Sequence, residues 1–250
     1  MDINDLTGKI ALVSGGSNGI GAATVRMLAA AGASVYVGYN KGAERAEKLI
    51  AALPGKGHRA VNIVLEESST MERLAEEIGR QHGRLDVLVN SAGFTKPIPH
   101  KNLDALDDAF FDSMMVANVR GPFAMIRTFA PLLKASGNAT VVNVSSISGF
   151  TGSGSSLVYC AAKAALDTMT ISLARVLGPE IRVLCASPGA VETDFVAGRG
   201  HDAMEKIAAA SPLKRIVQPE DVARTILACV THLTTTTGVR IVCDGGRFMN

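Results

Sequence analysis

Tyr159 and Lys163 are the two residues whose types and spacing most directly suggest chemistry. They stand four positions apart in a segment with apolar residues at helical spacing, so their side chains share one face of a predicted helix. An ammonium near a phenol stabilises the phenolate and lowers its pKa, which brings Tyr159 within range of proton transfer near neutrality. The same pair also occurs on ordinary solvated helix faces, so this interpretation needs further residues to support it.

A glycine-rich segment from Ser14 to Gly21 has the spacing GxxxGxG and lies between a short apolar run and an amphipathic one. Glycine permits positive φ and lets a backbone approach a diphosphate closely, while a helix N-terminus supplies amides and the positive end of its dipole. A plain turn is the alternative reading. The predicted strand before it and the predicted helix after it favour a dinucleotide site.

The hydrophobic pattern predicts the scaffold that positions these residues. Short β-branched runs alternate with longer amphipathic segments, which indicates a mainly parallel sheet with helices on both faces. We therefore predict an α/β, doubly wound Rossmann fold with a seven-stranded sheet, formed by residues 1–250 as a single domain. The predicted strands are Ile10–Val13, Ser34–Val37, Ala60–Val64, Val87–Asn90, Thr140–Ser145, Arg182–Ala186 and Arg240–Cys243.

The order of motifs along the chain resembles the short-chain dehydrogenase/reductase family, in particular its single-domain branch of 3-oxoacyl-carrier-protein reductase-like enzymes. That family carries a TGxxxGxG turn, an NNAG segment, a helical Asn, a Ser, a YxxxK pair and a PG…T segment. The matching positions here are Ser14–Gly21, Asn90–Gly93, Asn118, Ser146, Tyr159–Lys163 and Pro188–Thr193. Ser146 lies thirteen residues before Tyr159, whereas Ser145 and Ser148 are less suitably spaced. The resemblance covers essentially the whole chain.

The resemblance implies hydride transfer between a nicotinamide and a carbonyl or alcohol carbon, with Tyr159 as general acid and base. By the same resemblance, Lys163 lowers the pKa of Tyr159 and holds the nicotinamide ribose, Ser146 binds the reacting oxygen, and Asn118 positions a water of a proton relay. The residues expected to bind the cofactor are Gly15, Ser17, Asn18, Gly19, Ile20, Gly21, Tyr39, Asn40, Lys41, Asn90, Ala92, Gly93, Tyr159, Lys163, Pro188, Gly189, Val191 and Thr193.

The sequence departs from the family pattern in three segments of the chain. Val64 and Leu65 stand where an Asp usually meets the adenine, so adenine recognition is expected to be weaker or made by the backbone. Ser91 replaces the second Asn of NNAG, and Leu184 stands where an Asn is common. None of these changes removes a proposed catalytic group.

The segment Val35–Lys41 bears on the choice of cofactor. NAD-specific relatives place a carboxylate at the position of Tyr39, where it bonds the ribose hydroxyls and repels a 2′-phosphate. Asn40 and Lys41 can instead contact a 2′-phosphate, and Ser17 or Asn18 can add a hydrogen bond. We predict NADP in preference to NAD, with Lys41 as an ordinary solvated loop residue as the alternative.

Composition narrows the function classes. The 25 basic and 23 acidic residues are interspersed, so no nucleic-acid partner is expected. The start of the chain is acidic and no long apolar run follows, so we expect a cytoplasmic enzyme without a membrane partner. The four cysteines lack ligand or disulfide spacing, so no metal site is predicted and packing is favoured over redox chemistry even for Cys160.

The substrate is expected to be a small carbonyl or alcohol compound, and ketoacyl, sugar, steroid and aromatic-diol compounds all remain open. A non-catalytic dinucleotide sensor or scaffold is the rival function, and a lyase or epimerase is a weaker one. The strandless stretch Ala190–Lys214 is either a mobile lid or a surface insertion. The expected pocket walls are Phe94, Thr95, Phe150, Ala190, Val191 and this strandless stretch.

Assembly into a homodimer or homotetramer is expected through the helices that carry Asn118 and Tyr159. These helices hold more apolar residues than one buried face requires. The apolar positions in question are Phe110, Phe111, Met114, Met115, Met125, Ile171 and Leu177.

Overall fold

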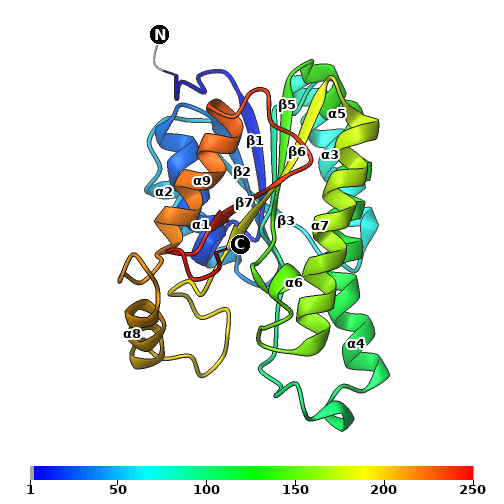
Figure 1. Ribbon diagram of the computed structural model, residues 1–250. Helices are drawn as coiled ribbons and strands as arrows, with labels where there is room; N and C mark the ends of the chain where they lie inside the picture. The colour runs from blue at the N-terminus through cyan, green and yellow to red at the C-terminus, as the bar shows by residue number, and fades with distance from the viewer. Residues whose placement is uncertain (1–2, 250) are drawn as a thin grey trace.

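Residues 3–249 are described in a computed structural model, and their strands form one sheet in the order β3-β2-β1-β4-β5-β6-β7. Every pair of neighbouring strands is parallel (Figure 1). This arrangement confirms the predicted Rossmann fold. The strands are β1 (Ile10–Ser14), β2 (Ser34–Tyr39), β3 (Arg59–Asn62), β4 (Val87–Asn90), β5 (Ala139–Val144), β6 (Ile181–Pro188) and β7 (Arg240–Cys243).

Helices cover both faces of the sheet, α1, α2 and α9 on one face and α3, α5 and α7 on the other (Figure 1). The helices are α1 (Gly19–Ala30), α2 (Ala43–Ala51), α3 (Ser68–His82), α4 (Asp108–Met115), α5 (Gly121–Ser136), α6 (Ser148–Thr151), α7 (Leu157–Leu177), α8 (His201–Ala210) and α9 (Pro219–Thr231). Two short turns complete the described elements, the 3₁₀ turn η1 (Leu103–Ala105) and the π-helical turn η2 (Val116–Arg120).

The central strands are buried on both sides because helices cover both sides. In β1, Ala11 and Val13 join the cluster beneath α1 and α9, while Ile10 and Leu12 join the cluster beneath α3 and α5. Alternate residues of a strand point to opposite faces, so a strand between two helical layers must be apolar at every position. This requirement explains the continuous apolar runs that predicted the strands.

Asp86 joins three parts of the fold immediately before β4. Its buried carboxylate accepts hydrogen bonds from the amide of Ile10 at 2.9 Å and the hydroxyl of Ser136 at 2.7 Å, and it pairs with the ammonium of Lys9 at 3.2 Å. Burial alone would raise the pKa of Asp86, but these three donors hold it below its usual value. Asp86 therefore ties β1 and α5 to β4.

The predicted strand boundaries agree with the structure to within two residues. Strands β2 and β6 extend two residues beyond their predicted ends, whereas β3 stops two residues early, at Asn62 rather than at Val64. Strand β3 ends early because the amide of Val64 donates to the hydroxyl of Thr70 in α3 instead of to a neighbouring strand. The stretch Ala190–Lys214 holds the helix α8, and a single parallel bridge joins Val191 to Val217.

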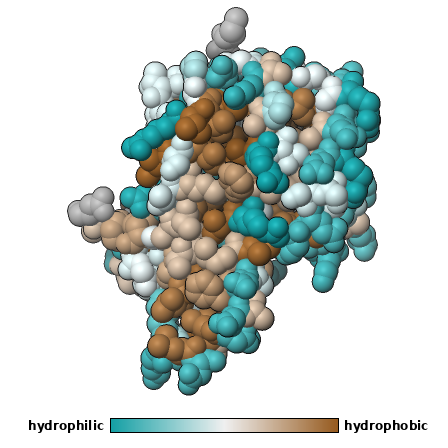
Figure 2. Space-filling model, turned by 90° about the vertical axis from the view of Figure 1, so that its right-hand side faces the viewer, coloured by the Kyte–Doolittle hydropathy of each residue, from teal (hydrophilic) through white to brown (hydrophobic). Residues whose placement is uncertain are grey.

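Helix α7 combines a buried face with an exposed apolar face. Within residues 3–249 it alone is long and apolar enough to cross a membrane, and 50% of its apolar window is buried. The core helix of a soluble protein can meet the same criteria of length and hydropathy. Figure 2 shows apolar side chains in a band over this side of the molecule.

The residues of that band differ in part from those predicted. Met114 and Met125 are fully buried inside the chain, so they are not available to a partner. Phe111 and Ile171 are about 40% exposed, as a contact surface requires. Three apolar side chains that the sequence analysis did not single out extend this surface, namely Phe123, Leu157 and Val176.

Candidate active site

The glycine turn connects β1 to α1 at the carboxyl edge of the sheet. Gly15 and Gly19 have positive φ, and the side chain of Asn18 accepts from the amide of Gly19 to cap α1. A Cβ on Gly15 would lie 2.8 Å from Cα of Ala92, and one on Gly21 would lie 2.1 Å from the carbonyl oxygen of Gly15. The turn therefore has no room for a side chain at Gly15 or Gly21, and it leaves the positive end of α1 at a cleft.

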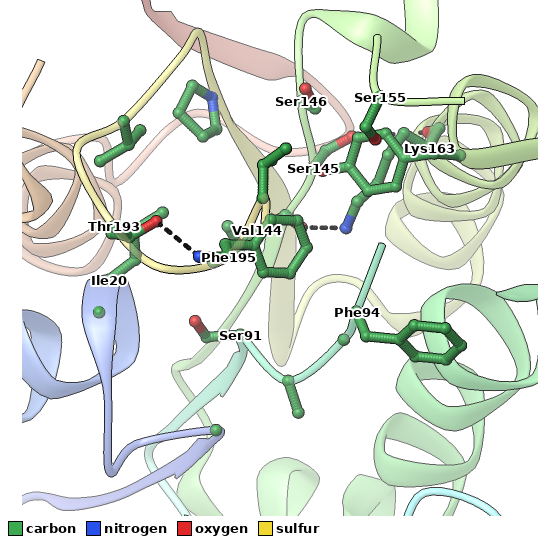
Figure 3. A pocket seen from close by; sticks show the side chains of 18 of the residues that line it. Ile20, Ser91, Phe94, Val144, Ser145, Ser146, Ser155, Lys163, Thr193 and Phe195 are labelled. Carbon is green, nitrogen blue, oxygen red and sulfur yellow. Dashed lines mark hydrogen bonds between the residues drawn. The ribbon is translucent and has the colours of Figure 1, made fainter. Parts of the chain in front are cut away.

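Ser146, Tyr159 and Lys163 come together on the other side of this cleft. Ser146 follows β5, and Tyr159 and Lys163 lie on α7, whose first turn is capped by Ser156. The ammonium of Lys163 donates to the carbonyl of Val144 at 2.9 Å and lies 5.6 Å from the centre of the Tyr159 ring. Figure 3 shows Lys163 and Ser146 on one side of the pocket, Ile20 and Thr193 on the other, and Phe195 between them.

The neighbouring serines Ser145 and Ser146, both near Tyr159, differ in their partners. Ser145 donates its hydroxyl to the carboxylate of Asp167 at 2.5 Å. Ser146 accepts from the amide of Ser148 at 3.1 Å and acts on Tyr159 to lower its pKa. The hydroxyl of Ser145 is therefore engaged with Asp167, whereas Ser146 lies beside Tyr159 in the cleft.

Burial dominates the electrostatics of Tyr159 and Lys163. Burial raises the pKa of Tyr159 well above its usual value, and the Ser146 hydroxyl and the Arg199 guanidinium act in the opposite direction. Burial lowers the pKa of Lys163 from 10.5 to about 8. In the protein without cofactor, desolvation of the phenol sets the direction of the shift, and the opposing effects come from Ser146 and Arg199 rather than from the expected Lys163.

Asn118 lies in η2, where the helix between α4 and α5 widens to a π-helical turn. Its amide nitrogen donates to the carbonyls of Phe94 at 3.1 Å and Met114 at 3.0 Å. Its oxygen is buried without a hydrogen-bond partner among the described residues and faces Gly93, where a Cβ would lie 2.7 Å away. An unpaired buried acceptor of this kind is suited to an ordered water, and π-helical turns often mark functional sites.

The cleft has a volume of about 680 Å³ and runs from the end of β2 past the glycine turn to Tyr159. That volume suits a dinucleotide cofactor and a small substrate. The predicted site residues that line it are Gly15, Ser17, Asn18, Gly19, Ile20, Tyr39, Asn40, Lys41, Ala92, Gly93, Ser146, Tyr159, Lys163, Pro188, Gly189, Val191 and Thr193.

Three predicted site residues do not line the cleft and lie instead behind its lining residues or in the interior. Gly21 packs against Gly15, Asn118 lies behind Gly93, and Asn90 bonds Asn143 at 2.8 Å in the interior. Asn143 bonds Thr170 of α7 in turn, at 2.8 Å. Asn90 therefore links β4 to β5, and Asn143 links β5 to α7.

The predicted pocket walls are confirmed in part. Phe94, Ala190 and Val191 line the cleft. Thr95 does not, because its hydroxyl bonds Ser155 at 2.6 Å, and Phe150 packs on Phe248 instead. The predicted stretch Ala190–Lys214 contributes Phe195 and Arg199 to the lining, whereas sequence reasoning missed Arg45, Arg247 and Phe248.

The departures from the family pattern have local explanations. Leu65 lines the cleft near the end of β3 and leaves no carboxylate at that position, whereas Leu184 lies fully buried in the core under α1 and α9. Ser91 donates its amide to the hydroxyl of Ser14 at 3.2 Å. Cys160 is buried and burial raises the pKa of its thiol, which agrees with a packing role.

Comparisons with known proteins agree with this geometry. A family model described as enoyl-(acyl carrier protein) reductase matches residues 15–247. The chain is 38% identical over 95% of its length to ketoacyl reductase 2 assigned to the granaticin polyketide synthase of Streptomyces violaceoruber, of which it covers 95%. It is 34% identical over 95% of its length to the cis-4-hydroxycyclohexanecarboxylate dehydrogenase of Sinomonas cyclohexanicum, of which it covers 96%.

A solved structure is also closely similar. It is that of a short-chain dehydrogenase/reductase from Burkholderia xenovorans, which superimposes with a TM-score of 0.88 at 31% sequence identity. The match covers 97% of this chain and 98% of that chain. The fold and the chain length thus agree with those of this structure over almost the whole chain.

Proposed function

The chain belongs to the short-chain dehydrogenase/reductase family and is an oxidoreductase that uses a nicotinamide cofactor, and we propose that Tyr159 is its general acid and base. The observation that carries this proposal is the position of Ser146, Tyr159 and Lys163 in the same cleft as the glycine turn. When bound, the nicotinamide supplies or accepts a hydride at the substrate carbon. A sensor without catalytic activity has no chemical need for these three groups.

Each side chain has a distinct task in this proposal. Tyr159 gives its phenolic proton to the carbonyl oxygen, and its raised pKa keeps that proton in place at neutral pH until charge develops on the substrate. Ser146 donates a hydrogen bond to the same oxygen, where negative charge builds. Lys163, held by the carbonyl of Val144, binds the nicotinamide ribose and supplies positive charge beside the phenolate. Asn118 holds the water that returns protons to this group.

The cofactor is held by the two ends of the cleft in this proposal. Gly19 and the start of α1 bind the diphosphate, and Thr193 lies beside Gly19, where a Cβ would meet its methyl group at 3.3 Å. Pro188, Gly189 and Val191, at and after the end of β6, border the nicotinamide.

Replacing Tyr159 by Phe tests the catalytic assignment. Tyr159→Phe removes the proton donor but almost no volume, so kcat should fall by about 100- to 10,000-fold while the cofactor Kd stays nearly constant. Tyr36→Phe is the matched control, because Tyr36 is buried and bonds Gln81, away from the cleft. The assay follows nicotinamide absorbance over a panel of ketones and alcohols, and substantial activity in Tyr159→Phe would refute the assignment.

We propose that the cofactor is NADP, and the position of Arg45 supports this choice over NAD. A Cβ on Gly42 would lie 2.8 Å from the guanidinium of Arg45 and 2.9 Å from the hydroxyl of Ser17, so these two groups meet over Gly42 at the end of the cleft. Lys41 lines the same end. No carboxylate within residues 3–249 pairs with Arg45, which leaves its charge free for a 2′-phosphate.

The ratio of kcat/KM for NADPH and NADH with one shared substrate tests this preference. We expect a lead of at least about 10-fold for NADPH, since the contacts are charge-assisted but exposed. Arg45→Gln should reduce the lead, and Tyr39→Asp should reverse it by repelling the phosphate. Equal values for the two cofactors in the wild type would refute the NADP assignment and leave the catalytic residues untouched.

We also propose that residues 1–250 act as one domain in the cytoplasm and assemble as a homodimer or homotetramer. Support for assembly comes from the exposed apolar residues of α4, α5 and α7, including Phe111, Phe123 and Ile171. Ile171→Glu places a charge on that surface and should yield monomers in light scattering at micromolar concentration. A monomeric wild type would contradict this proposal.

The names of the relatives support a ketone or secondary alcohol as the substrate class. One relative is named for a ketoacyl group and another for a hydroxycyclohexanecarboxylate. Both names describe a carbonyl or hydroxyl group on a carbon skeleton that also bears an acyl or acid function. We propose the same class for this chain.

A further inference from the structure

Two arginines line the cleft on the side of Tyr159 and have no part in the proposed chemistry. Arg199 lies just before α8 and is partly buried, and Arg247 lies after β7 and is exposed. Their positive charges lie close enough to interact, because burial first and then the charge of Arg247 lower the pKa of Arg199. Two guanidinium groups that repel each other beside a cleft form a site of positive potential.

Neither guanidinium has a carboxylate partner within residues 3–249, and the neighbouring acids are engaged elsewhere. The carboxylate of Asp244 accepts from the amides of Gly246 at 2.8 Å and Phe248 at 2.7 Å, which fixes the segment that carries Arg247. Glu192 bonds His201 and Gln218. Asp194 lines the cleft but forms no ion pair with either arginine. The positive charge of the two arginines is therefore available to a ligand.

Arg199 lies at the border between the cleft and a second pocket. Arg199 also lines a neighbouring pocket with Pro97, Ile98 and His100, and that pocket contains no residue of the glycine turn. The charge of Arg199 acts on Tyr159, so it lies within electrostatic reach of the reacting oxygen. Phe195 packs beside the ring of Tyr159, with 6.0 Å between the ring centres, and supplies an apolar wall.

We propose that the substrate carries a carboxylate that binds Arg199, with Arg247 adding positive charge from the C-terminal segment. The inference rests on the proposed function and specifies its substrate class as a keto acid or hydroxy acid with an apolar body. In the reduction, the carbonyl carbon gains the hydride and its oxygen gains the proton of Tyr159, while the carboxylate is unchanged. A planar guanidinium matches a carboxylate through two parallel hydrogen bonds.

The test compares two ketones of equal size, 4-oxocyclohexanecarboxylate and the neutral 4-oxocyclohexanecarboxamide. In the wild type, kcat/KM for the acid should exceed that for the amide by about 10-fold or more, the effect of one charge-assisted hydrogen bond. Arg199→Gln should reduce this ratio by about 10-fold. Arg247→Gln should reduce it by about 3-fold, because its side chain is exposed and its charge is screened.

Three further measurements sharpen the comparison. Arg199→Lys should keep part of the ratio, because it keeps the charge but loses the planar fork. Arg73→Gln is the matched control, since Arg73 is exposed on α3 and away from the cleft, and it should keep the wild-type ratio. A phosphopantetheine thioester of acetoacetate tests whether a phosphate takes the place of the carboxylate. If only this thioester loses rate in Arg199→Gln, the carboxylate assignment is wrong.

A wild-type ratio near one, or an unchanged ratio in the variant with both Arg199→Gln and Arg247→Gln, would also overturn the proposal. Calorimetry with the unreactive cyclohexanecarboxylate and cyclohexanecarboxamide, in the presence of NADP, separates this result from a failure of the proposed function. Carboxylate binding that depends on Arg199 without turnover of any ketone would refute only the function. Turnover of ketones without selective carboxylate binding would refute only the anion site.

Discussion

The buried ammonium of Lys163 should make the stability of this protein depend on pH in a defined direction. The residue is 5% exposed, and burial lowers the pKa of its side chain from 10.5 to about 8. Its hydrogen bond to Val144, 2.9 Å long, does not offset this loss of hydration. Lys163→Met keeps much of the volume of the side chain and removes the charge, so it isolates this contribution.

The direction of this pH dependence follows from the pH at which the folded and unfolded states each lose the proton of Lys163. The unfolded chain keeps the proton of Lys163 up to about pH 10.5, whereas the folded protein loses it at about pH 8. Between these values the unfolded state binds more protons, so the contribution of Lys163 to stability rises with pH. The difference between the two pKa values corresponds to about 3 kcal/mol, of which about 2 kcal/mol falls between about pH 7 and pH 9.5.

Other buried groups change the free energy of unfolding with pH in the opposite direction. Their contribution must be removed before that of Lys163 can be measured. Burial raises the pKa of Tyr159, and it raises the pKa of Cys229 to about 11 and of Cys243 to about 12. Their contributions make stability fall as the pH rises above about 9. Because these groups are present in both proteins, they cancel when the free energy of unfolding of Lys163→Met is subtracted from that of the wild type.

The assay is urea unfolding of the protein without cofactor at several pH values, with the protein concentration held constant because assembly would shift the midpoint. The wild-type free energy minus that of Lys163→Met should rise by about 2 kcal/mol from pH 7 to pH 9.5. Lys206→Met, at an exposed position on α8, should show no such rise. If the wild type and Lys163→Met change in parallel with pH, the desolvation argument for Lys163 is wrong.

Two further predictions concern the scaffold. Asp86→Asn leaves the donors around this position without a charged acceptor and should lower the free energy of unfolding by about 2–4 kcal/mol at neutral pH. Because the folded pKa of Asp86 lies below 3.8, the difference from the wild type should shrink as the pH falls below that value, and a constant difference in acid unfolding would contradict it. Gly21→Ala forces its Cβ against the carbonyl of Gly15 and should cost about 1–3 kcal/mol and weaken cofactor binding in a fluorescence titration. Gly79→Ala, where a Cβ meets only ordinary contact at 3.5 Å, is its control, and equal effects of both changes would refute the packing argument.

Local patterns were sufficient for the architecture. The apolar runs predicted seven strands because a strand covered on both sides must be apolar at every position, and this requirement is visible within five or six residues. The glycine turn was equally readable, since its position between a strand and a helix is a property of neighbouring residues. The boundary of β3 was not, because its end depends on the hydroxyl of Thr70 in the following helix.

The candidate site, like the fold, was predictable from the sequence only in part. The spacing of Tyr159 and Lys163 placed both side chains on one face of α7, because helical periodicity is local. The amino-acid sequence alone did not reveal that burial would raise the pKa of Tyr159 and lower that of Lys163. Desolvation depends on how completely other elements cover a group, and those elements come from distant parts of the chain.

The chain by itself thus determined the fold class, the glycine turn and the order of the chemical groups. Only the tertiary structure brought Arg45 to the end of the cleft near Tyr39, and Arg199 and Arg247 to the side of Tyr159. It also turned Asn90 into the interior and left the oxygen of Asn118 unpaired. The physical reason is that helix and strand periodicity are set by neighbouring residues, whereas the charge and hydration of a cleft are set by side chains that meet only when the parallel sheet aligns its carboxyl ends.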